Sequence, residues 1–404
     1  MKRTRILSVC MVLIAAALYA QTQSATSAQA VQPSPILTTL TAAFDRGDSQ
    51  TKLQVMTRAD SQPAAQMVPL YVHALDFVVN NASDVKTDAA LNQIALLTVR
   101  NLAKTGDASV LGQLWHLFVS VGDSSIQIET LNTMGALGKG DSQTVANLNS
   151  WIQSTALNSQ GGVQPNLELV IAAVSNLSKI AEESSVPAFL HVILAGLGNP
   201  ITTAAENGLF GIKGDTAALV VGAVEHFNLS QWSDAEQFFL SSTKTDAATR
   251  TKITAGILSL AVAYRTADEQ QQLTLRNLRA MLVRNLTQHP GAEAVPALVQ
   301  NFNLTVQDFD AGRATRDRLL ESIASLGASG ADPAAARLSD FLNLLNTYTE
   351  NDRPYDTQVV LAVINNLKSL GKQVAYQPVY YATLLKYPSR VLQAAQDALG
   401  ALQK

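Results

Sequence analysis

Histidines are the first candidates for proton transfer or metal binding, because their side chains titrate near neutral pH and coordinate metals readily. None stands in an H-E-x-x-H motif or in another close pair of ligands. His116 and His191 are separated by the same interval as Val99 and Val174, which begin two copies of a repeated tetrapeptide, and Gln300 takes the same position beside another copy. A position that recurs in this way favours packing over catalysis. The full set is His73, His116, His191, His226 and His289.

A serine nucleophile is the second candidate. Ser241–Lys244 has the S-x-x-K spacing and Lys104–Gly106 spells K-T-G, two elements of penicillin-binding serine acylases. The two elements occur in reversed order and the S-D-N element is missing. Lys104 also falls at the end of a helical pattern, whereas K-T-G belongs on a strand. We therefore expect no catalytic residue from this pair of motifs.

The segment Asp308–Gly312 begins like a calcium-binding loop. Such a loop needs an oxygen ligand at its fifth position and a glutamate at its twelfth, but Gly312 and Leu319 stand there. We expect no metal ion and no cofactor.

Charged and aromatic side chains are the candidates for a binding surface. The densest basic group is Arg276, Arg279 and Arg284, on a chain with 29 Lys+Arg, 32 Asp+Glu and a net charge of −3. Three arginines are too few to form the continuous basic surface that binds a phosphate backbone. We therefore expect this group to lie on a solvated helix face, and we expect no nucleic-acid partner. The aromatic residues recur at helical spacing, which favours the core over anchoring of a partner; they are Trp115, Trp151, Trp232, Tyr376, Tyr380 and Tyr381.

The elements that would carry these residues are helices. The chain is 47% hydrophobic, and its apolar residues recur every three or four positions, as in Leu131, Met134 and Leu137. No sustained alternation indicates a strand. A single cysteine excludes a disulfide framework. These features predict an all-α fold with a sizeable core.

The breaks between helical stretches share a Gly-Asp dipeptide. Glycine can close a helix in the left-handed conformation, and aspartate can then accept hydrogen bonds from the first amides of the next helix. Asn199-Pro200 and Asp332-Pro333 are predicted to begin helices in the same manner, as a cap followed by proline. The dipeptides begin at Gly47, Gly106, Gly122, Gly140 and Gly214.

Two other glycines, Gly208 and Gly211, lie inside a helical pattern, where glycine is less favourable than alanine by up to about 1 kcal/mol. We therefore predict that they mark close contacts between helices.

A repeat of larger period runs through the chain. A [Val/Ile]-x-Asn-Leu tetrapeptide occurs four times, and Val186-Pro187-Ala188 and Val295-Pro296-Ala297 each follow a copy at the same offset. Each unit therefore predicts one helix that ends near Asn-Leu, a short turn, and a partner helix that opens at Val-Pro-Ala. The copies are Val99–Leu102, Val174–Leu177, Val283–Leu286 and Ile364–Leu367.

These motifs resemble a known repeat family. Ala294–Val299 is similar to the first helix of a HEAT or HEAT-like (armadillo-type) repeat, and Met134–Asp141 is similar to the close of that family's second helix. The resemblance implies an α-α superhelix of about seven to eight HEAT-like helix pairs over residues 37–404. Such an array is stabilised by apolar contacts between neighbouring pairs.

The resemblance departs from the regular family pattern in two places. The ladder of Asp and Arg residues is not evident, since Arg100 and Arg284 have no counterpart at Ser175 or Asn365. Residues 228–275 fit the repeat worst, so we expect an irregular unit or an insertion there.

The first twenty residues are predicted to be a secretory signal peptide. Lys2, Arg3 and Arg5 precede the uncharged apolar run of residues 6–18, and Ala20 is the preferred cleavage point. An uncleaved anchor is the alternative. Residues 21–36 are predicted to be a flexible linker, because Gln, Ser, Thr, Ala and Pro dominate them.

The signal and the array together predict compartment and function. No later segment is apolar for long enough to cross a bilayer, so we expect no integral membrane segment after cleavage. Loss of Cys10 with the signal would leave no cysteine, which suits the periplasm or cell envelope. We expect an exported, non-enzymatic scaffold that binds a protein or peptide partner. The alternative is an enzyme, or an enzyme's accessory subunit, with a site assembled across repeats.

Overall fold

The computed structural model describes residues 34–402, and every regular element in that range is a helix. The predicted signal peptide, its cleavage point after Ala20 and nearly all of the linker lie outside the described residues. Within the described range the first helix begins at Pro35, two residues before the predicted start of the array.

The α-helices alternate with short turns along the whole described range. Four 3-10 helices are η1 (Ala108–Val110), η2 (Glu183–Ser185), η3 (Ala292–Ala294) and η4 (Gln373–Ala375). The twenty α-helices are α2 (Pro35–Arg46), α3 (Ser49–Asp60), α4 (Ala64–Asn80), α5 (Ala89–Thr105), α6 (Leu111–Ser120), α7 (Ser124–Leu137), α8 (Ser142–Gln160), α9 (Leu167–Ile180), α10 (Val186–Ala195), α11 (Asn199–Gly211), α12 (Thr216–Val224), α13 (Leu229–Ser241), α14 (Ala247–Ala263), α15 (Glu269–Gln288), α16 (Val295–Asp310), α17 (Arg316–Ala328), α18 (Asp332–Glu350), α19 (Thr357–Leu370), α20 (Tyr376–Ala382) and α21 (Ser389–Leu402).

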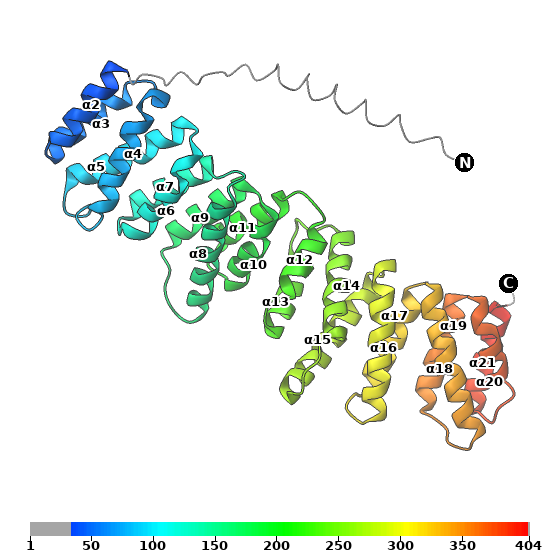
Figure 1. The fold of residues 1–404 in the computed structure, drawn as a ribbon. Helices are drawn as coiled ribbons and strands as arrows, with labels where there is room; N and C mark the ends of the chain where they lie inside the picture. Colours follow the sequence, from blue (N-terminus) through cyan, green and yellow to red (C-terminus); the bar gives the residue numbers. More distant parts are fainter. Residues whose placement is uncertain (1–33, 403–404) are drawn as a thin grey trace, which may run out of the picture.

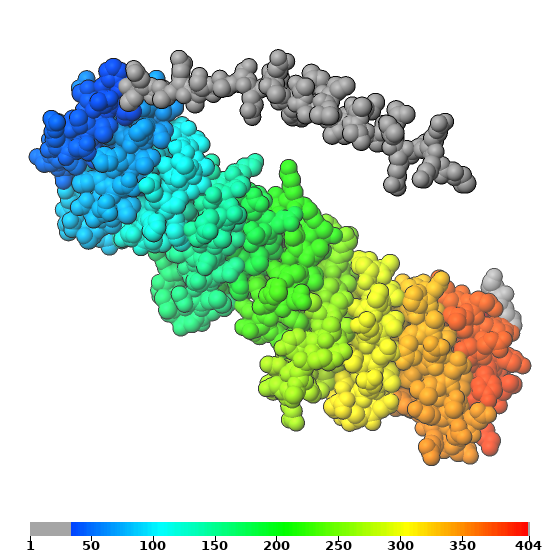
Figure 2. Space-filling view, viewed as in Figure 1, coloured from blue at the N-terminus to red at the C-terminus, as the bar shows by residue number. Residues whose placement is uncertain are grey.

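The helices form two layers that follow the order of the chain (Figure 1). Each even-numbered helix packs against the next even-numbered one from α2 to α20. The odd-numbered helices do the same from α3 to α11 and again from α13 to α21. One apolar core runs between the layers, and the colours follow one another along the body in bands (Figure 2). The all-α prediction is confirmed, and the arrangement is that of a helical repeat.

The number of helix pairs differs from the prediction. The twenty described α-helices, divided between two layers, make ten pairs, which is more than the seven to eight expected. The short helices account for the difference, because pairs such as α2 and α3, of 12 residues each, are more compact than the spacing of the tetrapeptides suggested.

The predicted irregularity coincides with the one interruption in the odd-numbered layer of the described residues. There, the backbones of α11 and α13 do not pack closely, and α13 packs mainly against α10, α12, α14 and α15. One aromatic contact remains, because Phe210 on α11 meets Phe239 on α13 edge-on with ring centroids 6.5 Å apart. Lys244, after α13, reaches back to Glu206 on α11 at 3.5 Å. One aromatic contact and one polar contact thus span the place where, elsewhere in the odd-numbered layer, neighbouring helices pack closely.

The repeated unit is more regular than the sequence motifs revealed. At each tetrapeptide one helix ends, a 3-10 turn follows, and a partner helix begins 12 positions after the first residue of the tetrapeptide. The last residue of the 3-10 turn is buried in all four copies. Two copies lack the Val-Pro start and open with Leu111 and Tyr376. Burial of one small or apolar side chain, more than the proline, therefore defines this turn.

The two arginines of the tetrapeptide make matching contacts. Arg100 on α5 reaches Glu129 on α7 at 3.0 Å, and Arg284 on α15 reaches Glu321 on α17 at 3.4 Å. Each arginine thereby joins its helix to the next one in the same layer. Both arginines are more than half exposed, so each pair contributes less than about 1 kcal/mol to stability.

The prediction that the aspartate of each Gly-Asp dipeptide caps the following helix is confirmed. In all five dipeptides the aspartate side chain accepts a backbone N–H hydrogen bond at the start of a helix. Three of the glycines, Gly106, Gly140 and Gly214, have positive φ angles, whereas Gly47 is extended. The aspartate, rather than a left-handed glycine, is the feature that all five breaks share.

The caps predicted at Asn199 and Asp332 are wrong. Helix α11 is capped by Gly198 and α18 by Ala331, with no side-chain hydrogen bond in either case. Asn199 and Asp332 are already the first helical residues. Because the first amides of a helix have no partner within it, proline is tolerated one position further in than predicted.

Replacement of Asp141 by alanine is expected to lower the free energy of unfolding by about 1 kcal/mol, because the Thr144 amide loses an acceptor at 2.7 Å. Asp332→Ala is the matched control. It removes only a highly exposed carboxylate that pairs with Lys372, so a change below about 0.5 kcal/mol is expected. Urea unfolding measures both, and equal losses would contradict the assignment of the caps.

Glycines inside helices mark close contacts at some positions and not at others. A Cβ atom at Gly208 would lie 2.5 Å from the Phe189 ring, which confirms the predicted close approach. Gly211 has no atom near enough to meet a Cβ, so the same prediction is wrong there. Gly135 and Gly327, which were not singled out, lie directly against the tetrapeptide asparagines Asn176 and Asn366.

Gly208→Ala is expected to destabilise the protein by about 1–3 kcal/mol, because Phe189 is fully buried and cannot move aside freely. Gly211→Ala is expected to be neutral or to stabilise by up to about 1 kcal/mol, since alanine favours the helix and meets nothing. In thermal unfolding, the midpoint temperature should fall for Gly208→Ala and should stay the same or rise for Gly211→Ala. A shift of both midpoints in the same direction would contradict this interpretation of the contacts.

Candidate functional site

The histidines selected from the sequence do not converge. His116 on α6 and His191 on α10 occupy the same position of their helices, as predicted. His191 stacks against Phe227 with ring centroids 4.3 Å apart, and burial lowers its pKa. Within residues 34–402 no three His, Cys, Asp or Glu side chains are grouped so that they could hold a metal ion. No helix in that range is both long and apolar enough to cross a bilayer, as expected.

The two serine-acylase elements lie on different helices and have structural partners. Lys104 lies in the last turn of α5 and reaches Asp60 on α3 at 3.0 Å. Lys244 follows α13 and contacts Asn207 and Glu206 on α11. Both lysines therefore tie neighbouring helices together.

The aromatic residues divide between core and surface. Trp232 is buried and meets Tyr264 edge-on at 5.8 Å. Trp115 and Trp151 pack against the core. Tyr380 and Tyr381 on α20 remain exposed, contrary to their predicted place in the core.

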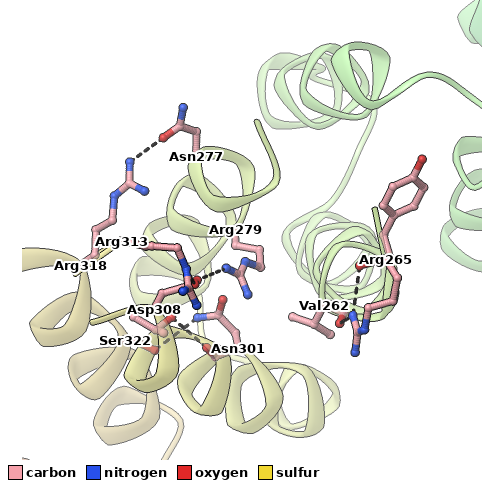
Figure 3. A network of polar contacts seen from close by, with 11 residues as sticks. Val262, Arg265, Asn277, Arg279, Asn301, Asp308, Arg313, Arg318 and Ser322 are labelled. Atoms are coloured by element: carbon pink, nitrogen blue, oxygen red, sulfur yellow. Dashed lines mark hydrogen bonds and ion pairs between the residues drawn. The ribbon is translucent and has the colours of Figure 1, made fainter. Parts of the chain in front are cut away.

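The basic group is not a solvated face. Arg279 is only 8% exposed, and its Nη2 donates to Asp308 Oδ2 at 2.9 Å. Arg313 donates from Nε to the other carboxylate oxygen at 3.0 Å. Figure 3 shows Arg279 and Arg313 converging on Asp308. The prediction holds for Arg284, which is more than half exposed, but is wrong for Arg279.

The same network accounts for the acidic residues of Asp308–Gly312, which resemble the beginning of a calcium-binding loop. Asp308 and Asp310 lie on the last turn of α16 and not in a loop. Two arginines form ion pairs with the carboxylate of Asp308. Asp310 accepts a hydrogen bond from the Tyr355 hydroxyl at 2.6 Å. The acidic spacing that resembled ligands is used for contacts within the protein.

A space between helices makes the network possible. Helix α15 packs mainly against α14 and α17, and α16 packs against α14, α17 and α18. The Arg279–Asp308 pair reaches across the space that this leaves between α15 and α16. On its other side, Arg265 donates to the carbonyl groups of Val262 and Tyr264 and so caps the end of α14.

An open pocket of about 420 Å³ lies here, and we call it the arginine pocket. Four arginines line it with a single carboxylate, so its formal charge is strongly positive. Apolar side chains of α14, α15 and α16, together with Tyr264, Thr266 and Gln272, form the rest of the wall. The lining includes Arg265, Arg276, Arg279, Arg313, Asp308 and Leu275.

Two guanidinium groups of the pocket retain unused donors. The Nε atoms of Arg276 and Arg279 are buried and have no hydrogen-bond partner. Both residues also line an adjoining cavity of about 20 Å³, beside Asn301, whose Oδ1 is unpaired as well. Burial lowers the pKa of Arg279 and Asp308 opposes this, so the arginine stays charged at any physiological pH.

Sequence reasoning found Arg276 and Arg279 but missed the pocket. The available signal was their spacing of three residues, which places both on one face of α15. Arg265 and Arg313 lie beyond helix ends, and only the packing of three helices brings them to the same space.

A buried acid that the sequence did not reveal lies at the irregular unit. Glu236 on α13 is 1% exposed, and its Oε1 accepts hydrogen bonds from Thr254 at 2.7 Å and Asn285 at 3.0 Å. Its other oxygen has no partner. Burial raises the pKa of Glu236 above its usual 4.5, with the two hydrogen bonds acting in the opposite direction.

Glu236 should make stability depend on pH. Below about pH 4.5 both states hold the proton; above it the unfolded chain loses the proton first, so stability falls as pH rises through the raised pKa. Glu236→Gln is expected to flatten this decline, which urea unfolding between about pH 4.5 and 8 measures. Exposed Glu225→Gln is the control, and parallel curves for Glu236→Gln and the unaltered chain would contradict the assignment.

Comparisons with known proteins identify no family. No protein-family model matches the chain, and no curated protein matches it. A crystal structure described as an engineered protein is similar over 91% of this chain and 99% of its own, at 14% sequence identity and a TM-score of 0.34. Likeness at that level carries no inference about this chain.

Proposed function

We propose that this chain is an exported, non-enzymatic interaction scaffold that binds a protein or peptide partner on the surface of HEAT-like helix pairs. The observation that carries the proposal is the arginine pocket, which opens on the array where α14, α15 and α16 leave a space between them. Buried charge with unused donors has a cost to folding. A ligand that satisfies those donors supplies a reason for the arrangement.

The extended form of the array supports the same proposal. Two layers in chain order place successive helix ends and turns along the body, so a partner can contact several units at once (Figure 2). In repeat proteins such surfaces are the usual binding sites. The four matching turns after α5, α9, α15 and α19 support assignment of the pairs as HEAT-like.

Export is proposed from Lys2, Arg3 and Arg5 and the apolar run that follows them. Cleavage after Ala20 would give a mature chain that begins at Gln21, in the periplasm or cell envelope. N-terminal sequencing of the protein recovered from its host tests this, and an intact Met1 in the membrane fraction would favour the anchor.

Site-specific photo-crosslinking in the native envelope tests the scaffold. A photoreactive residue replaces Tyr264 at the pocket or Leu273 on α15, both well exposed, and Leu157 on distant α8 serves as the control. We expect the first two positions to crosslink a defined polypeptide and Arg276→Gln to abolish that product. Absence of crosslinks from every position, together with substrate turnover by the purified chain, would favour the enzymatic alternative.

A further inference from the structure

We propose that the arginine pocket receives the carboxylate side chains of an acidic peptide segment. This inference rests on the proposed function, because it names the chemistry of the partner. The charge distribution is the first step. The chain as a whole is slightly acidic, yet four of its arginines line one pocket with a single carboxylate. Such a concentration attracts an anion locally while the rest of the surface does not.

The second step is the state of the donors. Arg279 is more than nine-tenths buried, and its Nε has no partner although its Nη2 is bound to Asp308. The Nε of half-buried Arg276 is likewise unpaired. Buried donors are almost always satisfied, and a guanidinium group offers two parallel N–H groups that match a carboxylate. The pocket therefore holds donors whose natural complement is missing from the chain itself.

The existing contacts and the walls of the pocket indicate which kind of anion fits it. Two arginines of the pocket, Arg279 and Arg313, already hold a carboxylate, that of Asp308, at 2.9 and 3.0 Å. Beside them, Ala261, Leu275 and Leu304 form an apolar wall, which suits the aliphatic parts of a peptide. A nucleic-acid strand would need basic residues at regular intervals beyond the pocket, and the net charge of −3 works against a long polyanion. An acidic peptide segment fits these features best.

The position of Asp308 gives the proposal an unusual test. Its carboxylate lies between Arg279 and Arg313 and neutralises part of the charge that a ligand would meet. Removal of that negative charge should strengthen binding, whereas removal of an arginine should weaken it. A non-specific basic surface would respond to any change in net charge, whereas the pocket should respond to changes in the residues that line it.

The experiment uses the mature chain and a fluorescein-labelled octaglutamate peptide, followed by fluorescence anisotropy at low salt. We expect Arg276→Gln to weaken binding about tenfold, as loss of one charge-assisted contact implies. The affinity of Arg276→Lys should lie between those of the unaltered chain and Arg276→Gln, because lysine keeps the positive charge but lacks the two parallel N–H groups of the guanidinium. Asp308→Asn should strengthen binding several-fold. Arg284→Gln removes the same charge from the same helix outside the pocket and should change affinity less than about twofold.

Several outcomes would overturn the proposal. Equal effects of Arg276→Gln and Arg284→Gln would show that only net charge matters. Tighter binding of octathymidylate than of octaglutamate would assign the pocket to nucleic acid, and full displacement of the peptide by an equal concentration of pyrophosphate would assign it to a small anion. Circular dichroism of each variant confirms that the helices remain folded.

The result is separable from that of the scaffold proposal. If crosslinking captures a partner while the pocket variants bind octaglutamate equally, the acidic-peptide inference fails and the scaffold stands. If octaglutamate binding follows the expected order but no position yields a crosslink, the chemistry of the pocket is supported and the scaffold fails.

Discussion

Replacement of Phe341 by alanine is expected to lower the free energy of unfolding by about 3–5 kcal/mol. Phe341 on α18 is 1% exposed, and its ring meets that of Phe302 on α16 edge-on at 5.2 Å and that of Tyr355 at 6.1 Å. Arg337 lies over both phenylalanine rings, at 4.9 and 5.9 Å from their centres. The substitution would leave a cavity between neighbouring helices of the even-numbered layer.

The effect should also be local. In an array whose units contact only their neighbours, a weakened junction lets one side open before the other. Hydrogen exchange should therefore rise in α18 to α21 and stay unchanged in α2 to α11. Leu344→Ala on the same helix is the control, because that side chain is 41% exposed and should cost less than about 1 kcal/mol. A uniform rise in exchange over the whole chain would contradict the repeat architecture.

Removal of the Asp308 carboxylate is the second large effect. Asp308→Ala leaves Arg279 charged, buried and without its partner, and breaking such a pair costs about 3–5 kcal/mol. Both side chains keep some exposure, 10% and 13%, so we expect a loss near the lower limit of about 3 kcal/mol. Urea unfolding should show a lower midpoint with an unchanged slope.

Two further variants separate charge burial from packing. Arg279→Met combined with Asp308→Leu removes both charges and should restore stability to within about 1 kcal/mol of the unaltered chain. Arg313→Gln removes only the exposed partner of the same carboxylate and should cost less than about 1 kcal/mol. A double variant as unstable as Asp308→Ala would mean that the pair stabilises the fold outright.

The repeat shows how far local sequence reasoning reached. The tetrapeptides and the Val-Pro-Ala motifs predicted where α9, α10, α15 and α16 end and begin, because a helix that buries one face needs apolar residues at fixed intervals. The 3-10 turn was not visible, since it depends on burial of a single residue such as Ser185 or Ala294. Burial of one side chain leaves no periodic signal.

The same contrast holds for individual glycines and caps. Asp141 was correctly assigned because its hydrogen bond closes within three residues of the chain. Asp332 was misplaced by one position, because proline is tolerated anywhere in the first turn and does not fix the residue at which α18 begins. Gly211 was misassigned for another reason, since what a Cβ atom would meet there depends on how the surrounding helices pack.

The sequence by itself determined that this chain is helical and repetitive, because helix periodicity and capping act between residues close in the chain. Only the tertiary structure decided that Arg279 is buried, that Asp308 is its partner and that a positively charged pocket lies between α15 and α16. The reason is physical: electrostatic and packing contacts depend on distance in space, and residues 279 and 308 meet only after three helices have packed.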